Sequence, residues 1–380
     1  MKKVSNIKSE FPPRLALWQM KKTSIHKSLN FTTMKKSIFL ILMLVTLSST
    51  YVLGQAGHNS YPIPLTGCSD SSLAPIAGKS YNYQAIVNPT GGNFQWWATT
   101  NQQFINGGVN NISTMLLSPT TTPAGTDLIA TSASYGTTSL TPNVDITWSS
   151  ATLAAAQTTP TFVVVQYDAP ATCGNNLKVL LIDPMNGFTV DVRNMYANYD
   201  TVAYGVTIDT CVSPIASAQY NATNNNVVYD FGDNKLLFEV VLANFSDSAN
   251  VSFTLSNLQG TQTADLSWGY TPATANTFPL GANLPNGLVP TSAPVETTET
   301  NTSVGVSFFV LATINNNTYQ GLANTDFTLA VDAENSEGEP DVKNEDCTIA
   351  SFEDLATQTL LARPTVTETP APDDFLPVAP

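Results

Sequence analysis

Histidine, the side chain that most often serves acid–base catalysis and zinc binding, is scarce in this chain. The sequence contains two histidines, His26 and His58. A Ser-His-Asp or Cys-His arrangement would have to use His58, because His26 lies in a segment that we expect to be removed. A histidine-based zinc site would likewise have His58 as its single histidine ligand. The sequence also lacks a Gly-rich turn with a lysine that could hold phosphate. The sequence therefore predicts a non-enzymatic protein without catalytic residues.

Carboxylates are the abundant reactive groups, and they gather between a predicted strand and Cys347. Oxygen ligands on a loop suit Ca²⁺, which takes about six to eight of them. The spacing is not that of an EF-hand, and a solvated acidic loop is the leading interpretation, so no cofactor is expected unless Ca²⁺ binds here. Paired carboxylates also keep a glycan hydrolase open as a hypothesis. The candidate calcium ligands are Asp332, Glu334, Glu337, Glu339 and Asp341.

Residues 34–54 have the pattern of a bacterial export signal. Met34-Lys35-Lys36 forms a basic start, residues 38–45 are apolar, and Val52 and Gly54 are small enough for cleavage before Gln55. The apolar stretch is too short to span a bilayer comfortably. Residues 1–33 are basic and lack a core pattern. We interpret them as a start-site artefact or a disordered segment, with a long native N-terminal region as the alternative.

Cleavage would make the chain strongly acidic. Nine of its 15 basic residues but only one of its 29 acidic residues precede Gln55, which leaves six basic and 28 acidic residues and a net charge of −22. Such a surface repels nucleic acid and anionic membrane, since both need clustered Lys and Arg. We expect a protein or a glycan as partner, no nucleic acid and no membrane span, and the oligomeric state stays open.

Four cysteines follow the signal: Cys68, Cys173, Cys211 and Cys347. An even number in an exported protein suggests two disulfides, and three connectivities are open. Pairing within the proposed domains gives Cys68–Cys173 and Cys211–Cys347. Free thiols are the alternative.

Alternation of apolar and polar residues with period two dominates the remaining sequence. It is clear around Tyr81, Trp96, Ile146, Phe253 and Leu329, and it predicts half-buried antiparallel strands. More continuously apolar runs at residues 162–165, 179–182 and 236–242, the last of which includes Glu239, suit central strands. Clusters of Thr, Asn, Gly and Pro separate these segments. Short helical turns are expected at 151–157 and 352–361. The pattern predicts an all-β protein.

A weak repeat favours two tandem domains. Asp145-Ile146-Thr147-Trp148 returns as Asp265-Leu266-Ser267-Trp268, although a chance match stays open. We predict antiparallel β-sandwiches at 60–186 and 187–350, a long exposed loop at 271–302 within the second, and a Pro-rich tail at 351–380.

Aromatic residues supply the expected core. Trp97 is out of phase with Trp96, so it is predicted to face outward or toward the second domain, as an interface residue or a surface on which a glycan stacks. The predicted core aromatics are Phe94, Trp96, Trp148 and Trp268.

Three segments of the first predicted domain resemble the PKD-like and immunoglobulin-like domains of exported bacterial proteins. They are Gly92-Asn93-Phe94-Gln95-Trp96 followed by Gly107-Gly108, then residues 144–148, then residues 162–167. The position of Cys173 also fits that pattern. The export signal and the Thr- and Asn-rich chain resemble surface proteins of gliding bacteria. These resemblances imply immunoglobulin-like sandwiches and say little about function.

The leading functional prediction is a secreted or cell-surface structural or interaction protein that presents loops on β-sandwich domains. A carbohydrate-binding or adhesive module that uses Trp97 is the alternative, and a carboxylate-dependent glycan hydrolase is the second alternative. The location is extracellular, at the cell surface, or periplasmic.

Overall fold

Strands make up nearly all the regular structure of the described residues. The computed structural model describes residues 62–112, 116–119, 128–170, 174–289, 291–299 and 301–366. The predicted segments 1–33 and 34–54, together with His58, Cys173 and residues 367–380, lie outside the described residues. The described strands belong to one compact unit, Gly57–Pro380, so the division into two domains stays a prediction.

Two three-stranded antiparallel sheets form the first part of the structure. One has the order β1 (Ser80–Gln84), β6 (Asn143–Trp148), β5 (Leu128–Thr131), and the other β2 (Asn93–Thr99), β7 (Thr161–Asp168), β8 (Asn175–Ile182). Alternate residues of these strands share one buried cluster, which contains Phe94, Trp96 and Trp148. The period-two pattern thus positions the aromatic side chains between the sheets.

Trp97 occupies the opposite face of β2 from Trp96, as the alternation requires. It packs against Ile112 and Val164 in a separate small cluster beside β3 (Ile105–Asn106) and β4 (Val109–Asn110), and only 1 % of it is exposed. The prediction of an outward Trp97 is therefore wrong. The segment that carries β3 and β4 covers the face that a lone sandwich would leave open.

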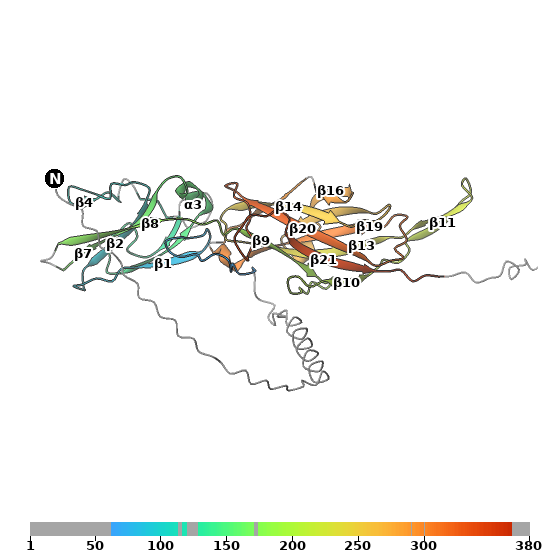
Figure 1. Ribbon diagram of the computed structural model, residues 1–380, viewed down its shortest axis with the longest axis horizontal. Helices are drawn as coiled ribbons and strands as arrows, with labels where there is room; N and C mark the ends of the chain where they lie inside the picture. Colours follow the sequence, from blue (N-terminus) through green and yellow to red (C-terminus); the bar gives the residue numbers. More distant parts are fainter. Residues whose placement is uncertain are drawn as a thin grey trace, which may run out of the picture. The chain divides into compact units, whose positions relative to one another are not determined.

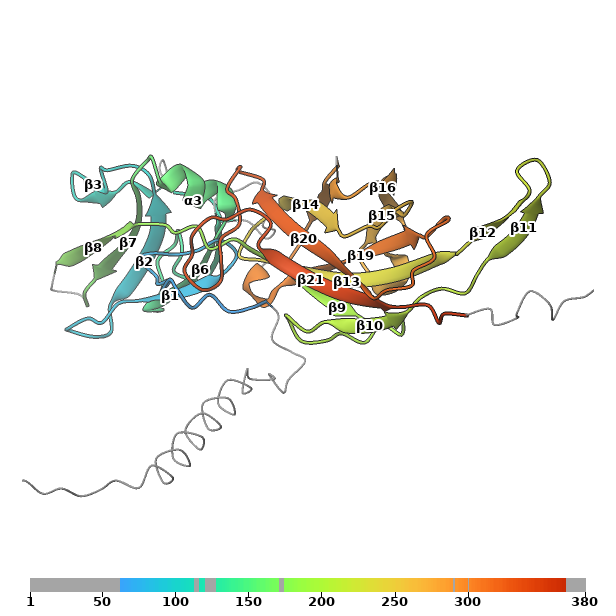
Figure 2. The same ribbon diagram turned by 45° about the vertical axis from the view of Figure 1, so that its right-hand side comes forward.

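Two larger sheets form the second part. The five-stranded sheet has the order β16 (Phe278–Leu284), β15 (Thr263–Gly269), β19 (Val306–Asn315), β13 (Asp233–Ala243), β9 (Thr189–Met195). The six-stranded sheet has the order β10 (Ile208–Cys211), β21 (Asp354–Leu361), β20 (Thr325–Asn335), β14 (Ser248–Ser256), β17 (Gly287–Leu288), with β18 (Ala293–Glu296) also on β14. Their inner faces share a cluster that includes Trp268. Figures 1 and 2 show both sheets and the parallel approach of β10 to β21.

Two predicted segments differ from the structure. The expected loop 271–302 contains β16, β17 and β18, with 3₁₀ turns at Pro272–Thr274 and Thr302–Val304. The expected helical turn at 352–361 is strand β21, so the Pro-rich tail does not begin at residue 351. Residues 356, 358 and 360 of β21 point inward. One of them, the buried Gln358, is polar, so the sequence of β21 lacks the regular alternation of apolar and polar residues.

Two further elements complete the described chain. Helix α3 (Ser150–Ala156), which begins at the N-cap Ser149, confirms the helical turn expected at 151–157. Strands β11 (Ser217–Asn221) and β12 (Asn226–Asp230) form a separate hairpin whose β12 residues are all exposed. Both views show this hairpin projecting beyond the sheets (Figures 1 and 2). The described residues contain no helix with the length and hydropathy that a membrane crossing requires.

Candidate functional site: the disulfide clamp

A disulfide joins Cys68 to Cys347, residues separated by 279 positions. The predicted pairs Cys68–Cys173 and Cys211–Cys347 are therefore wrong. Cys211 is an exposed free thiol, and Cys173 lies outside the described residues. The prediction assumed that each bridge closes within one domain, whereas the segment before β1 crosses to the loop that follows β20.

Hydrogen bonds hold the segment around Cys68 flat against that loop, and we call the whole contact the disulfide clamp. Thr66 N donates to the carbonyl of Asn344 at 2.7 Å. Asp191 accepts from Asn344 Nδ2 at 2.7 Å and from Ile63 N at 3.0 Å. A Cβ atom on Gly67 would lie 1.9 Å from the carbonyl oxygen of Glu345, so only glycine permits this approach. The clamp therefore consists of the disulfide together with hydrogen bonds and a close backbone approach.

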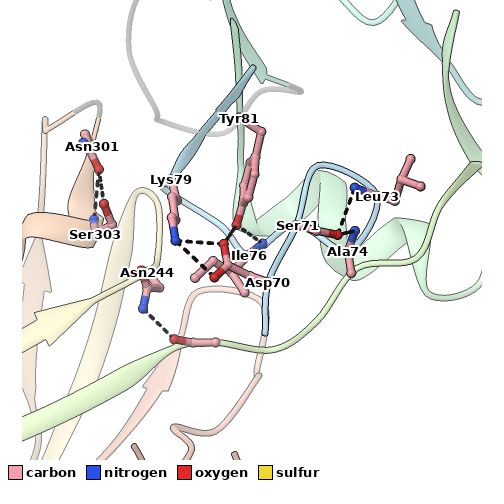
Figure 3. Close-up of polar contacts among 11 residues, drawn as sticks. Asp70, Ser71, Leu73, Ala74, Ile76, Lys79, Tyr81, Asn244, Asn301 and Ser303 are labelled. Carbon is pink, nitrogen blue, oxygen red and sulfur yellow. Dashed lines mark hydrogen bonds and ion pairs between the residues drawn. The ribbon is translucent and has the colours of Figure 1, made fainter. Parts of the chain in front are cut away.

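The chain just beyond Cys68 is fixed by a polar cluster around Asp70 (Figure 3). Lys79 pairs with the Asp70 carboxylate at 2.8 Å, and the Tyr81 hydroxyl donates to it while accepting from Ile76 N. Burial opposes ionisation of Asp70, but the hydrogen bonds from Lys79 and Tyr81 outweigh it, so the pKa of Asp70 is lowered. The cluster anchors the start of β1 to the segment that carries Cys68.

A second set of hydrogen bonds joins helix α3 and the segment just before β1 to the β13–β14 connection and the 3₁₀ turn Thr302–Val304. Ser150 and Ser246 exchange bonds, each backbone N–H donating to the other hydroxyl at 2.8 and 3.0 Å. Thr302 N donates to the carbonyl of Gly78 at 3.0 Å, and its hydroxyl bonds to Phe245. All of these groups are buried, which makes the bonds costly to break.

Replacing Gly78 by alanine tests this contact. The backbone of Gly78 has φ +66°, and an added Cβ would lie 1.9 Å from Thr302 Oγ1. We expect a loss of about 2–4 kcal/mol in the free energy of unfolding, measured by urea denaturation, from backbone strain and displacement of Thr302. Gly107→Ala is the control, because Gly107 has φ +60° and open space around it. Equal losses in the two variants would contradict the role given to Thr302.

Three carboxylates with raised pKa values lie at the clamp. Burial raises the pKa of Asp191 to about 7, against the hydrogen bonds that it accepts. Burial likewise raises the pKa of Asp341, which accepts from Ala333 N, to about 7. Burial and the nearby charges of Asp191, Asp341, Glu353 and Glu345 raise that of Asp354 to about 8. The clamp therefore holds protons at a pH where exposed carboxylates have lost them.

These pKa values make stability depend on pH. Between about pH 4 and pH 8 the folded chain keeps a proton on Asp354 that the unfolded chain has released, so stability falls as pH rises through that range. We expect Asp354→Asn to raise the melting temperature at pH 8 and to leave it unchanged at pH 3, where the residue is neutral in both the folded and the unfolded chain. The exposed Asp209→Asn serves as control. A gain for Asp354→Asn that is equal at both pH values would show that charge is not its cause.

The candidate calcium ligands lie at and beyond the end of β20. Glu339 accepts from Asn335 Nδ2 at 2.9 Å and from Gln157 Nε2 at 2.8 Å, and Asp341 is buried. Within the described ranges, no group of three or more His, Cys, Asp or Glu side chains is arranged to hold a metal ion. Calcium binding stays a prediction, and a chelator that leaves the melting temperature unchanged would remove it.

Sequence reasoning missed most of the clamp. It selected Cys68 and Cys347 singly, and Asp341 as a calcium ligand. It passed over Asp191, which lies between the apolar residues Val190 and Val192, and Asp354, which lies in the segment 352–361 that was expected to form a helical turn. One signal was available for Asp191: a lone carboxylate within the otherwise apolar run around Val190 and Val192.

A separate concave site is lined by residues of the five-stranded sheet together with residues of β10 and β21. Its volume is about 250 Å³. Tyr196 and Tyr199 are about half exposed and come from the turn after β9. Tyr199 has φ +72°, a conformation that bulky residues seldom adopt. Lys235, Asn276 and Gln358 add polar groups. We call this the tyrosine site.

Comparison with known proteins shows distant similarities only. No protein-family model and no curated protein matches the sequence. Among solved structures, the N-terminal domain of PorA is 13 % identical and covers 45 % of this chain and 96 % of its own, with a TM-score of 0.23. The collagen adhesin of S. aureus (10 % identity, 78 % and 94 % covered, TM-score 0.22) and the CupB6 tip adhesin of Pseudomonas aeruginosa (7 %, 80 % and 97 %, 0.23) also match. At these TM-scores the matches carry no argument about function.

Proposed function

We propose that this chain is an exported, non-enzymatic interaction protein that presents exposed elements on a rigid β scaffold at the cell surface. The observation that carries the proposal is the disulfide clamp between Cys68 and Cys347. Stable disulfides form in oxidising compartments, and a bridge across 279 positions fixes distant parts of one chain. The resemblance to surface proteins of gliding bacteria is part of the proposal.

The hairpin β11–β12 is the element that we assign to display. Tyr220, Val227 and Tyr229 are exposed although their residue types favour burial. A two-stranded hairpin gains little stability by itself, and exposed apolar residues of this kind mark contact surfaces. Its edges are free within the described structure, since β11 and β12 pair only with each other.

The free thiol of Cys211 provides a direct test of location. Cys211 is exposed, so a membrane-impermeant maleimide added to intact cells should label it if the protein is on the cell surface. The variant Cys211→Ser controls for labelling elsewhere. Labelling only after the outer membrane is permeabilised would place the protein in the periplasm, and labelling only after lysis would contradict export.

A second experiment tests display. The triple variant Tyr220→Ser, Val227→Ser, Tyr229→Ser should keep the melting temperature, because these side chains are exposed, and lose co-purification with surface assemblies. The matched control is Leu355→Ser, an exposed apolar residue on β21. Co-purification that survives the triple variant would remove the hairpin from the proposal.

Carbohydrate binding is the second candidate, favoured by the tyrosine site rather than by the buried Trp97. Half-exposed aromatic rings beside amide and ammonium groups suit sugar stacking and hydrogen bonding. Binding on a glycan array that disappears in Tyr196→Ala, Tyr199→Ala and survives in Tyr220→Ala would support it. The absence of any array signal would remove it.

A further inference from the structure

A cleft of about 740 Å³ opens into the first pair of sheets, and we call it the sheet-end cleft. Pockets for small molecules commonly have volumes of about 300–1,000 Å³. One wall is the chain that follows β1, with Ile86 and Val87, and the other is the inner face of the β2–β7–β8 sheet. Ile86 is 95 % exposed, so an apolar side chain stands at the cleft without covering.

The wall formed by β2 contains a buried donor. Trp96 lines the cleft and is 1 % exposed. No described residue accepts a hydrogen bond from its indole Nε1. The other tryptophan of the same core, Trp148, donates to the Tyr83 hydroxyl at 3.3 Å. A buried N–H without an acceptor costs about 1–3 kcal/mol, and such groups are rare in proteins.

A cation stands on the same face of the same sheet. Trp96 pairs in register with Val165, and Val165 with Lys178, so the three side chains form one row across β2, β7 and β8. Cross-strand partners project from the same face, which places Lys178 on the side that carries the core. The ion pairs among described residues do not include Lys178. Lys178 is one of six basic residues after Gln55.

We propose that the sheet-end cleft binds a small apolar carboxylate. The carboxylate accepts hydrogen bonds from Trp96 Nε1 and Lys178, and the apolar body packs against Ile86, Val87 and Leu180. The remaining surface is strongly acidic and repels anions, so an anion that binds must find a local donor and cation. The cleft supplies both, together with apolar area that stabilises the rest of the molecule.

Calorimetry with the purified chain tests the site, with decanoate as the probe and decan-1-ol as its uncharged counterpart. We expect one decanoate per chain. Trp96→Phe, which removes the N–H and keeps an aromatic ring, should weaken decanoate about tenfold, and so should Lys178→Met. Lys178→Met should leave decan-1-ol binding unchanged. The matched controls Trp148→Phe and Lys235→Met should stay within about twofold of the native affinity.

A second measurement does not depend on the variants folding. With tryptophan indoles labelled with ¹⁵N, decanoate should shift the Trp96 N–H resonance of the native chain and leave that of Trp148 in place. No binding up to about 1 mM decanoate would overturn the proposal. Binding that ignores both Trp96→Phe and Lys178→Met, or an unshifted Trp96 resonance, would also overturn it. These last outcomes are expected if Lys178 serves only to protect the edge strand β8 from aggregation.

Discussion

Replacing Cys68 by serine will lower the free energy of unfolding by about 3–5 kcal/mol, the largest effect that we expect from one side chain outside the core. The bridge to Cys347 spans 279 positions, and the entropy that a disulfide removes from the unfolded chain grows with the loop that it closes. Urea denaturation under non-reducing conditions measures the loss. The clamp should also loosen locally, with faster hydrogen exchange at the amide of Thr66.

The free cysteine provides the matched control for this prediction. Cys211→Ser removes an exposed thiol that forms no bridge in the described structure, so stability should change by less than about 0.5 kcal/mol. Reducing agent should destabilise the native chain and leave Cys68→Ser unaffected. Equal stability of the native chain and Cys68→Ser in the absence of reductant would contradict the clamp.

Removing one partner of the buried ion pair between Arg193 and Glu239 should lower the free energy of unfolding by about as much as Cys68→Ser does. These residues pair in register on β9 and β13, their charged groups lie 2.8 Å apart, and both side chains are 3 % exposed. Arg193 also lies over the Tyr204 ring at 5.3 Å. Glu239→Gln leaves a buried guanidinium without its counter-charge, and we expect a loss of about 3–5 kcal/mol in urea denaturation.

The double variant separates the net contribution of the ion pair to stability from the penalty of leaving one buried charge without its partner. Arg193→Met combined with Glu239→Leu removes both charges and keeps the volume, so it should be more stable than Glu239→Gln alone. Lys343→Met, which breaks the partly exposed pair with Glu353, should change the denaturation midpoint little. A double variant less stable than Glu239→Gln would contradict this account.

Much of the fold follows from local alternation. The patterns around Tyr81, Trp96, Ile146, Phe253 and Leu329 correspond to β1, β2, β6, β14 and β20. Period two identifies such strands because one face is buried and the other is polar. It failed for β21 because the inward Gln358 donates to the carbonyl of Leu237, so a polar side chain occupies a core position. It also failed for β16 to β18, where Pro and Gly are frequent.

The clamp could not be predicted, because long-range pairing is absent from local patterns. The position of Cys68 against Cys347 depends on where the segment before β1 runs, and that path is fixed by bonds such as Thr66 to Asn344. The prediction that Trp97 faces outward was wrong for a similar reason. Its phase in the strand gave the correct face of β2, but the segment that carries β3 and β4, which lies elsewhere in the sequence, covers that face.

The bridge between Cys68 and Cys347 also decides how the protein responds to mechanical tension. A pull between residue 62 and Arg363 passes from Cys68 through the two sulfur atoms to Cys347 and on into β21. The whole covalent loop between the cysteines is bypassed, including both sheets of the first pair. The load falls instead on the hydrogen bonds of β21 with β10 and β20. Under such a pull the chain lengthens only at its ends while the disulfide holds.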